Sequence, residues 1–210
     1  MKDKEQTKRK LIQAVGEIIK SKGYIGLGVN KIAKKAGVDK TLIYRYFGGV
    51  NYLIEAYVIE KDYWMTLSEE VKEMIEKNKG LSSQVLITEI LQNQFKFFFS
   101  EQEMQDLIIL EISTESSLMQ SIHNVREGMG RQLLELTDNQ FNNTNVNFRA
   151  ISALLVGGIY YSVLHTRFNG DMICDININS IEGRNEIIRA IQQIVSWAYQ
   201  EAENNSATIT

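Results

Sequence analysis

Residues 29–47 read VNKIAKKAGVDKTLIYRYF and contain two short amphipathic segments on either side of a glycine. Across residues 31–36, the isoleucine and alanines fall on one side of a helix and the lysines on the other. Gly37 then turns the chain, and the side chains of Asn30 and Asp39 are placed to cap the two helices. Two helices, over residues 31–36 and 40–47, joined by a tight Ala-Gly-Val turn predict a helix-turn-helix.

The helix over residues 40–47 has a face that suits the major groove of DNA. Ile43 and Phe47 are four residues apart and are expected to face inward. The opposite face carries Lys40, Thr41, Tyr44 and Arg45. Lysine and arginine reach guanine edges or phosphates, threonine meets a thymine methyl group, and a tyrosine hydroxyl donates to phosphate. This face therefore predicts contact with DNA.

Charge is divided unequally along the chain. Residues 1–50 carry a net charge of +8 and residues 51–210 a net charge of −11, although the whole chain is at −3. A compact basic segment is expected to bind a polyanion, because each phosphate that it neutralises releases counterions. A solvated, charged surface is the alternative explanation of the charge alone. The helix-turn-helix pattern favours the polyanion, and specifically DNA.

A further amphipathic helix is predicted over residues 4–22, where apolar residues recur at helical spacing before Gly23. With this helix and the glycine-tyrosine pair that follows it, the run over residues 29–47 resembles the DNA-binding domain of the TetR family of bacterial transcriptional regulators. The resemblance covers about residues 5–55. It is specific because the patterns I-A-x-x-A-G-V and I-Y-x-Y-F occur in the family's order and spacing.

The resemblance implies a set of DNA contacts. The recognition helix would carry Lys40, Thr41, Leu42, Tyr44 and Arg45. Members of the family often contact phosphates at the positions of Asn30, Lys31 and Tyr46. One departure concerns the start of the fourth helix, where many relatives have a Lys-Glu pair and this chain reads Gly48-Gly49-Val50-Asn51. Asn51 is the expected substitute for the phosphate contact there.

Beyond residue 50 the periodic stretches are long, and the chain has no proline to interrupt a helix. Helices are predicted near residues 51–78, 82–100, 103–113, 116–138, 147–168 and 183–203, with loops over 139–147 and 169–180. The second loop is long enough to have some structure of its own. The expected fold is all-α, with about nine helices. A three-helix DNA-binding domain (residues 1–50) would precede a larger helical domain for ligand binding and dimerisation (residues 51–210).

The last two predicted helices indicate a homodimer. The helix over 147–168 is apolar almost all round, and the helix over 183–203 has a broad apolar stripe. A second subunit would cover them in a four-helix arrangement, as the family resemblance also implies. A purely intramolecular core is the alternative. The predicted interface residues are Leu155, Gly158, Ile187, Ile191, Ile194, Val195 and Ala198.

Aromatic residues of the larger domain are candidates for the lining of an effector site, since such sites are mainly apolar. Glu111 is added as a carboxylate that would select a cationic or hydrogen-bonding ligand. Ordinary core residues and, for Glu111, a surface acid are the alternatives. The candidates are Trp64, Phe95, Phe98, Phe99, Met104, Glu111, Tyr160, Tyr161 and Phe168.

Other classes of function find little support in the sequence. His123, His165 and Cys174 form no metal-ligand pattern, and no phosphate-binding glycine loop or nucleophile-base motif occurs, so we expect no metal, cofactor or enzymatic activity. The first twenty residues lack the apolar segment of a signal peptide, and the uncharged residues 150–166 are short for a membrane span. A cytoplasmic location is therefore predicted.

The expected function is that of a ligand-responsive repressor. It would bind a palindromic operator as a homodimer, and an unknown small molecule would release it. A protein-interaction or ligand-binding module on the same fold, with weak or lost DNA binding, is the alternative. The altered segment at residues 48–51 motivates it.

Overall fold

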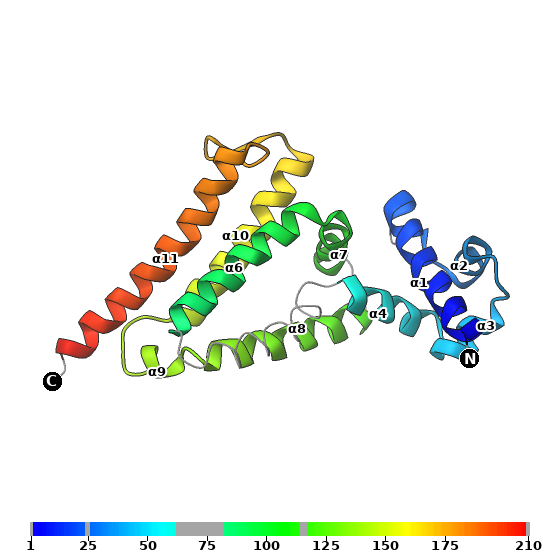
Figure 1. Cartoon of the computed structure of the whole chain (residues 1–210), viewed down its shortest axis with the longest axis horizontal. Helices are drawn as coiled ribbons and strands as arrows, with labels where there is room; N and C mark the ends of the chain where they lie inside the picture. Colours follow the sequence, from blue (N-terminus) through cyan, green and yellow to red (C-terminus); the bar gives the residue numbers. More distant parts are fainter. Residues whose placement is uncertain (1, 24–25, 62–81, 114–116, 209–210) are drawn as a thin grey trace. The chain divides into compact units, whose positions relative to one another are not determined.

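The computed structural model describes residues 2–23, 26–61, 82–113 and 117–208, and this part is almost entirely helical (Figure 1). Its ten helices are α1 (Lys2–Lys22), α2 (Val29–Ala36), α3 (Thr41–Phe47), α4 (Val50–Lys61), α6 (Ser83–Ser100), α7 (Gln102–Ser113), α8 (Ser117–Glu135), α9 (Asp138–Phe141), α10 (Phe148–Phe168) and α11 (Ile181–Thr208). One antiparallel hairpin pairs β1 (Met172–Ile173) with β2 (Ile176–Asn177). The predicted all-α fold with an N-terminal helix-turn-helix is confirmed.

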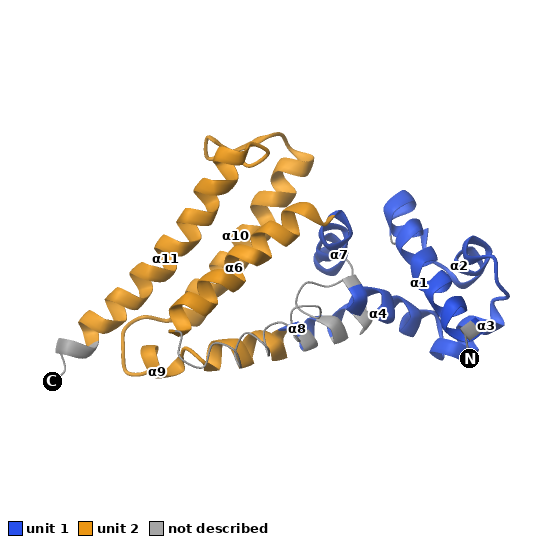
Figure 2. Cartoon of the chain, in the orientation of Figure 1, with its two compact units in different colours: residues 1–70, 102–126 blue, residues 71–101, 127–210 orange. Residues whose placement is uncertain are grey.

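Contacts divide the chain into two compact units (Figure 2). The first comprises residues 1–70 and 102–126, and the second residues 71–101 and 127–210. The first unit therefore contains α1 to α4 together with α7, which follows much later in the sequence. The predicted domain boundary after residue 50 lies inside this unit, at the start of α4.

The first unit is built around one apolar core to which all of its early helices contribute. Leu11 of α1, Ile32 of α2, Ile43 of α3 and Leu53 of α4 have no exposed area, and residues of α7 join the same cluster. Gly37 ends α2 with φ of 66°, and the amide of Val38 donates to Ala33 in the turn. Because glycine adopts this left-handed conformation without strain, the turn between α2 and α3 is tight.

In the second unit α6 packs against both α10 and α11. At one end of α11, three aromatic rings from different helices form a cluster. Phe141 of α9 stacks on Phe148 of α10 with ring centroids 4.5 Å apart, and Tyr199 of α11 meets both rings edge-on. The cluster attaches the short α9 to the long helices through dispersion and aromatic contacts.

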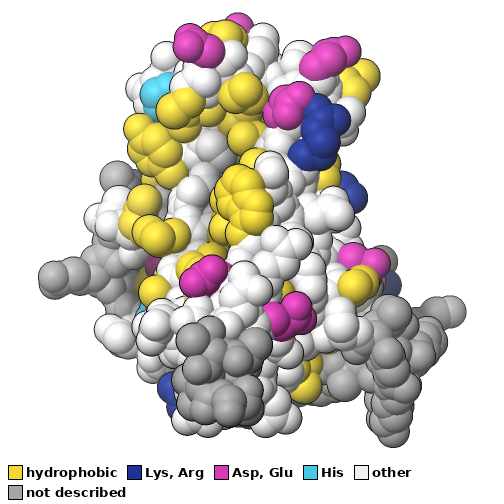
Figure 3. Space-filling model, turned by 90° about the vertical axis from the view of Figure 1, so that its left-hand side faces the viewer, with side chains coloured by type: hydrophobic (Ala, Val, Ile, Leu, Met, Phe, Trp, Pro, Cys, Tyr) yellow, Lys and Arg dark blue, Asp and Glu magenta, His cyan; other side chains and the backbone are white. Residues whose placement is uncertain are grey.

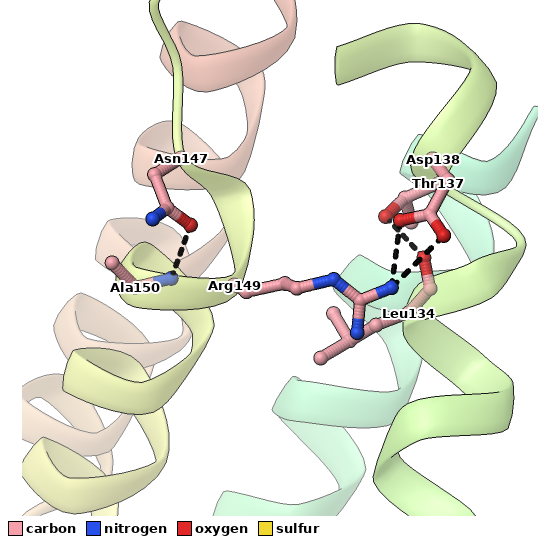
Figure 4. Close-up of polar contacts among 6 residues, drawn as sticks. All are labelled: Leu134, Thr137, Asp138, Asn147, Arg149 and Ala150. Atoms are coloured by element: carbon pink, nitrogen blue, oxygen red, sulfur yellow. Dashed lines mark hydrogen bonds and ion pairs between the residues drawn. The ribbon is translucent and has the colours of Figure 1, made fainter. Parts of the chain in front are cut away.

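Polar contacts fix the start of α10 (Figure 4). The side-chain oxygen of Asn147 accepts a hydrogen bond from the amide of Ala150 at 3.0 Å and so caps the helix. Arg149 binds both carboxylate oxygens of Asp138, at 2.7 and 2.9 Å, and thereby joins α10 to α9. The cap explains why the helix begins where the sequence predicted it, within one residue.

Several boundaries differ from the predictions. α2 begins at Val29, so Asn30 lies inside the helix, and no side chain caps its N-terminus. The loop predicted over residues 139–147 begins with the end of α9, and the loop over 169–180 contains the hairpin. α11 continues to Thr208, five residues beyond the predicted end. The predicted helix over residues 51–78 agrees with α4 as far as Lys61, and its remainder lies outside the described residues.

Candidate nucleic-acid interface

The recognition helix α3 has one covered side and one open side. Ile43 is completely buried, and Phe47 packs partly buried against the same core. Four side chains on the other side are exposed, with Tyr44 retaining 56% of its area. They are Lys40, Thr41, Tyr44 and Arg45. The face predicted for the major groove is therefore open to solvent in the first unit.

Asp39 holds the first turn of α3. Its Oδ1 accepts a hydrogen bond from the Thr41 amide at 2.8 Å and another from the Thr41 hydroxyl at 2.5 Å. These two bonds favour the ionised carboxylate and lower the pKa of Asp39 below its ordinary value. Asp39 thus holds the start of α3 as expected, although the helix begins at Thr41 and Lys40 occupies the N-cap position. The hydroxyl of Thr41 is engaged by this bond, so the methyl group is the part of the side chain that suits a thymine.

Exposed basic and polar side chains of α2 lie in the same unit. Asn30 and Lys31 are exposed in its first turn, and Lys34 is exposed in the next. Lys35 differs, because its Nζ lies 2.8 Å from a carboxylate oxygen of Glu17 on α1. The ammonium group lowers the pKa of Glu17, and the pair joins α2 to α1. Lys35 therefore contributes to the contact between α1 and α2 as well as to the positive charge of the domain.

Tyr46 and Leu42 occupy intermediate positions on α3. Tyr46 is half-buried, and the Nζ of Lys4 lies 5.7 Å from the centre of its ring. This cation–π contact places a positive charge of α1 beside the tyrosine that the family resemblance assigns to a phosphate. Leu42 is also half-buried.

The start of α4 carries the departure noted in the sequence. Asn51 is exposed in its first turn, as the substitute phosphate contact requires. Tyr52 beside it was not among the predicted contacts, yet it retains 62% of its area. Its ring lies 3.5 Å from the place where a Cβ of Gly48 would be. An aromatic residue next to a glycine pair was the signal in the sequence, but only the structure shows that the ring is open to solvent.

The candidate effector residues lie in three different settings. Phe95, Phe98, Phe99 and Tyr160 belong to the second unit, where the rings of Phe98 and Tyr160 are 4.7 Å apart. Met104 and Glu111 belong to the first unit, and Tyr161 and Phe168 are exposed on α10. Trp64 lies outside the described residues.

Glu111 is not an isolated carboxylate. It forms an ion pair with Arg126 of α8, whose side chain is 9% exposed, and its other oxygen lies 3.4 Å from Nδ1 of His123. A carboxylate with a guanidinium partner has its charge already matched. The structure therefore favours an interhelical contact between α7 and α8 over the expected selection of a cationic ligand by Glu111.

The residues predicted for the dimer interface differ in their exposure. Gly158 is exposed on α10, and Leu155, Ile187 and Ile194 are half-buried. Ile191, Val195 and Ala198 are buried in the second unit, where α11 packs against α6. The apolar stripe of α11 therefore packs largely against α6 of the same chain. The large apolar side chains that remain exposed on α10 and α11 are not among the residues predicted for the dimer interface.

Comparison with known proteins gives one family and one fold. Residues 9–57 match the family model described as bacterial regulatory proteins, tetR family. No curated protein sequence is significantly similar to the chain.

Solved structures share the fold along nearly the whole chain. A Clostridium perfringens protein described as a candidate regulator of fatty acid metabolism is similar with a TM-score of 0.64 and 14% identity, over 89% of this chain and 96% of that one. A TetR family transcription regulator from Marinobacter aquaeolei VT8 has a TM-score of 0.60 and 14% identity, over 92% and 98% of the chains. RolR in complex with its ligand resorcinol has a TM-score of 0.53 and 12% identity, over 96% and 95%.

Proposed function

Through the domain at residues 9–57 the chain belongs to the TetR family of bacterial regulators, and from this premise we propose that it is a ligand-responsive repressor that binds a palindromic operator as a homodimer. The observation that carries the proposal is the recognition helix. Ile43 anchors α3 in the core, while Tyr44 and Arg45 are exposed on its other side. A helix that is anchored in the core on one side and exposes polar and basic side chains on the other suits the major groove.

An open apolar face on α10 and α11 supports the homodimer. Leu154 and Tyr161 of α10 retain 77% and 63% of their areas, and Trp197 of α11 retains 58%. Hydrophobic side chains gather on the upper part of the face that Figure 3 presents. Large exposed apolar side chains grouped in this way are typical of a protein interface. In the described part of the chain no atom lies within 4 Å of the missing Cβ of Gly158, so this glycine would let a second helix approach closely.

The composition of α10 agrees with a helix covered from two sides. By length and mean hydropathy it is able to cross a membrane, yet only 28% of its most apolar window is buried within the chain. Its buried residues, among them Ile159 and Val163, form one side, and Leu154 and Tyr161 form another. In the proposed dimer the second subunit covers this other side.

The proposed effector is a small molecule that binds the larger helical part. RolR, which shares the fold, holds resorcinol in its structure, and this supports the proposal by analogy. Two recognition helices about 34–36 Å apart would read two half-sites one turn apart. An effector that favours another separation weakens operator binding, and by linkage the operator weakens effector binding equally.

The function is tested by selecting fragments of the organism's own genome at increasing salt. A repressor retains a small set of specific fragments at moderate salt, because specific sites bind roughly 10³-fold or more tighter than random DNA. A module that no longer recognises a DNA sequence releases all fragments together as the salt concentration rises. Uniform, weak binding throughout the genome contradicts the proposal and favours that alternative.

The dimer is tested with Leu154→Arg. An arginine on this open face leaves the core of the subunit unchanged, but it places an unpaired charge inside the proposed interface. The dissociation constant of the dimer is expected to rise at least about tenfold, measured by sedimentation equilibrium. Glu186→Arg, an exposed position paired with Arg189 within α11, serves as the control for added charge. If the dissociation constant of the dimer is unchanged in Leu154→Arg, the dimer interface lies elsewhere on the protein.

A further inference from the structure

One buried amide interrupts the apolar side of α6. This side is formed by Leu86, Ile87, Ile90, Leu91, Phe95 and Phe98, all of them buried. Gln94 lies among them and is only 1% exposed. Burying a polar side chain is unfavourable unless its hydrogen bonds are made, so a glutamine at this position requires partners.

The amide is satisfied at one end only. Its Nε2 donates to the hydroxyl oxygen of Tyr160 on α10 at 3.0 Å, and this bond fixes the direction of the group. Its carbonyl oxygen Oε1 is buried and has no hydrogen-bond partner among the described residues. A carbonyl oxygen has two lone pairs, so Gln94 presents a strong acceptor whose hydrogen-bonding capacity no described group uses.

Aromatic residues neighbour Gln94 along α6 and, through Tyr160, on α10. The ring of Tyr160 lies 4.7 Å from that of Phe98, and Phe95 is fully buried with its ring 6.4 Å from Phe99. Flat apolar side chains with one directed polar group are the usual composition of a site for a small ligand. The charged side chains of the two helices themselves are exposed: Glu89 and Lys96 of α6, and Arg149 and Arg167 of α10. The guanidinium of Arg184 on α11 lies 4.7 Å from the Phe99 ring, but it already donates to the carbonyl oxygens of Ile178 and Asn179.

From this arrangement we infer that the effector is a neutral, ring-containing molecule whose hydroxyl or N–H group donates a hydrogen bond to Oε1 of Gln94. The inference rests on the proposed function, whose effector it describes. A carboxylate ligand would meet a carbonyl oxygen, and the guanidinium of Arg184 is already hydrogen-bonded to the carbonyl oxygens of Ile178 and Asn179. An ammonium ligand would find no carboxylate on the inner sides of the described helices α6 and α10. A neutral donor satisfies the acceptor and leaves the apolar surroundings intact.

The inference is tested by calorimetric titration of the full chain with phenol and with toluene, which has nearly the same shape but no donor. The quantity measured is the ratio of their dissociation constants, toluene over phenol. Gln94→Leu removes the acceptor and keeps an apolar side chain, so the ratio is expected to fall about tenfold, because a site that pairs a hydroxyl discriminates against its absence. Tyr160→Phe, which frees the amide but keeps the ring, is expected to lower the ratio to a smaller extent.

A second glutamine on the same helix provides the matched control. Gln92 donates to the carbonyl oxygen of Ile188 at 3.0 Å, so its amide serves packing between α6 and α11. Gln92→Leu is expected to keep the parent ratio. Circular dichroism shows for each variant whether the fold is retained, and Gln94→Leu should retain it because it removes an unpaired acceptor.

Three outcomes would overturn the inference. They are an unchanged ratio in Gln94→Leu, no binding of either compound at millimolar concentration, and tighter binding of benzylammonium than of phenol, which would indicate a cationic effector. Failure of the proposed function is recognised separately, because these titrations contain no DNA. If the protein prefers phenol through Gln94 but selects no genomic fragment, the inferred ligand site is supported and the repressor function is contradicted.

Discussion

Replacing Arg45 with alanine is expected to weaken specific operator binding roughly hundredfold, since a base contact is worth about 1–3 kcal/mol and the proposed dimer would lose it in both half-sites. Arg45 is exposed on the open side of α3, two residues beyond the buried Ile43, so the substitution leaves the core intact. Fluorescence anisotropy with the selected operator and with random DNA of the same length measures the effect. The loss should be much smaller on random DNA.

Lys34→Ala is the control for loss of positive charge. Lys34 is exposed on α2, and we expect only long-range attraction from it. Its replacement should weaken binding to operator and random DNA by the same factor and reduce the dependence on salt slightly. If Arg45→Ala behaves in the same way as Lys34→Ala, Arg45 does not read bases and the orientation proposed for α3 is wrong.

Gly183→Ala is expected to lower the free energy of unfolding by about 3 kcal/mol, at the upper end of the usual cost of overpacking. A Cβ at residue 183 would lie 1.9 Å from the carbonyl oxygen of Asn177 and 2.5 Å from its carbon. These are backbone atoms at the end of β2, so they cannot move aside as a flexible side chain would. The first turn of α11 must separate from the hairpin. Urea denaturation at a fixed protein concentration measures the change.

Gly128→Ala provides the matched control, because no atom of the residues that the structure describes lies within 4 Å of the missing Cβ of this helical glycine. There the same substitution should stabilise the protein by about 0.5–1 kcal/mol, since alanine loses less backbone entropy in a helix. Equal effects of the two substitutions would show that α11 and the hairpin do not pack as closely as the structure has them.

Local structure could be predicted wherever a periodic pattern had a clear end. The helix-turn-helix was predicted correctly because residues 29–47 combine helical spacing with a glycine turn. Asn30 was wrongly expected to cap α2, since capping residues occur inside helices as well. The short α9 and the hairpin were missed because four-residue and two-residue elements show no periodicity.

The candidate effector site could be predicted only in part. The aromatic candidates of α6 and α10 all lie in the second unit, although Tyr161 and Phe168 are exposed there. Gln94 was missed, because the sequence gives no sign that a glutamine on an apolar helix has one unpaired end. Glu111 was considered as a ligand, whereas its partner Arg126 is fifteen residues away and pairs with it only through folding.

The sequence by itself determined the type of protein, because residues close together in the chain make the recognition helix, its cap and its buried anchor. Only the tertiary structure decided which apolar faces are covered. In α11, the spacing shows an apolar stripe but not the helix that packs against it. Val195 is buried in the second unit, while Trp197, two residues later, is exposed. The physical reason is that helical periodicity sets the direction of each side chain around its own axis, whereas burial depends on which distant segment packs there.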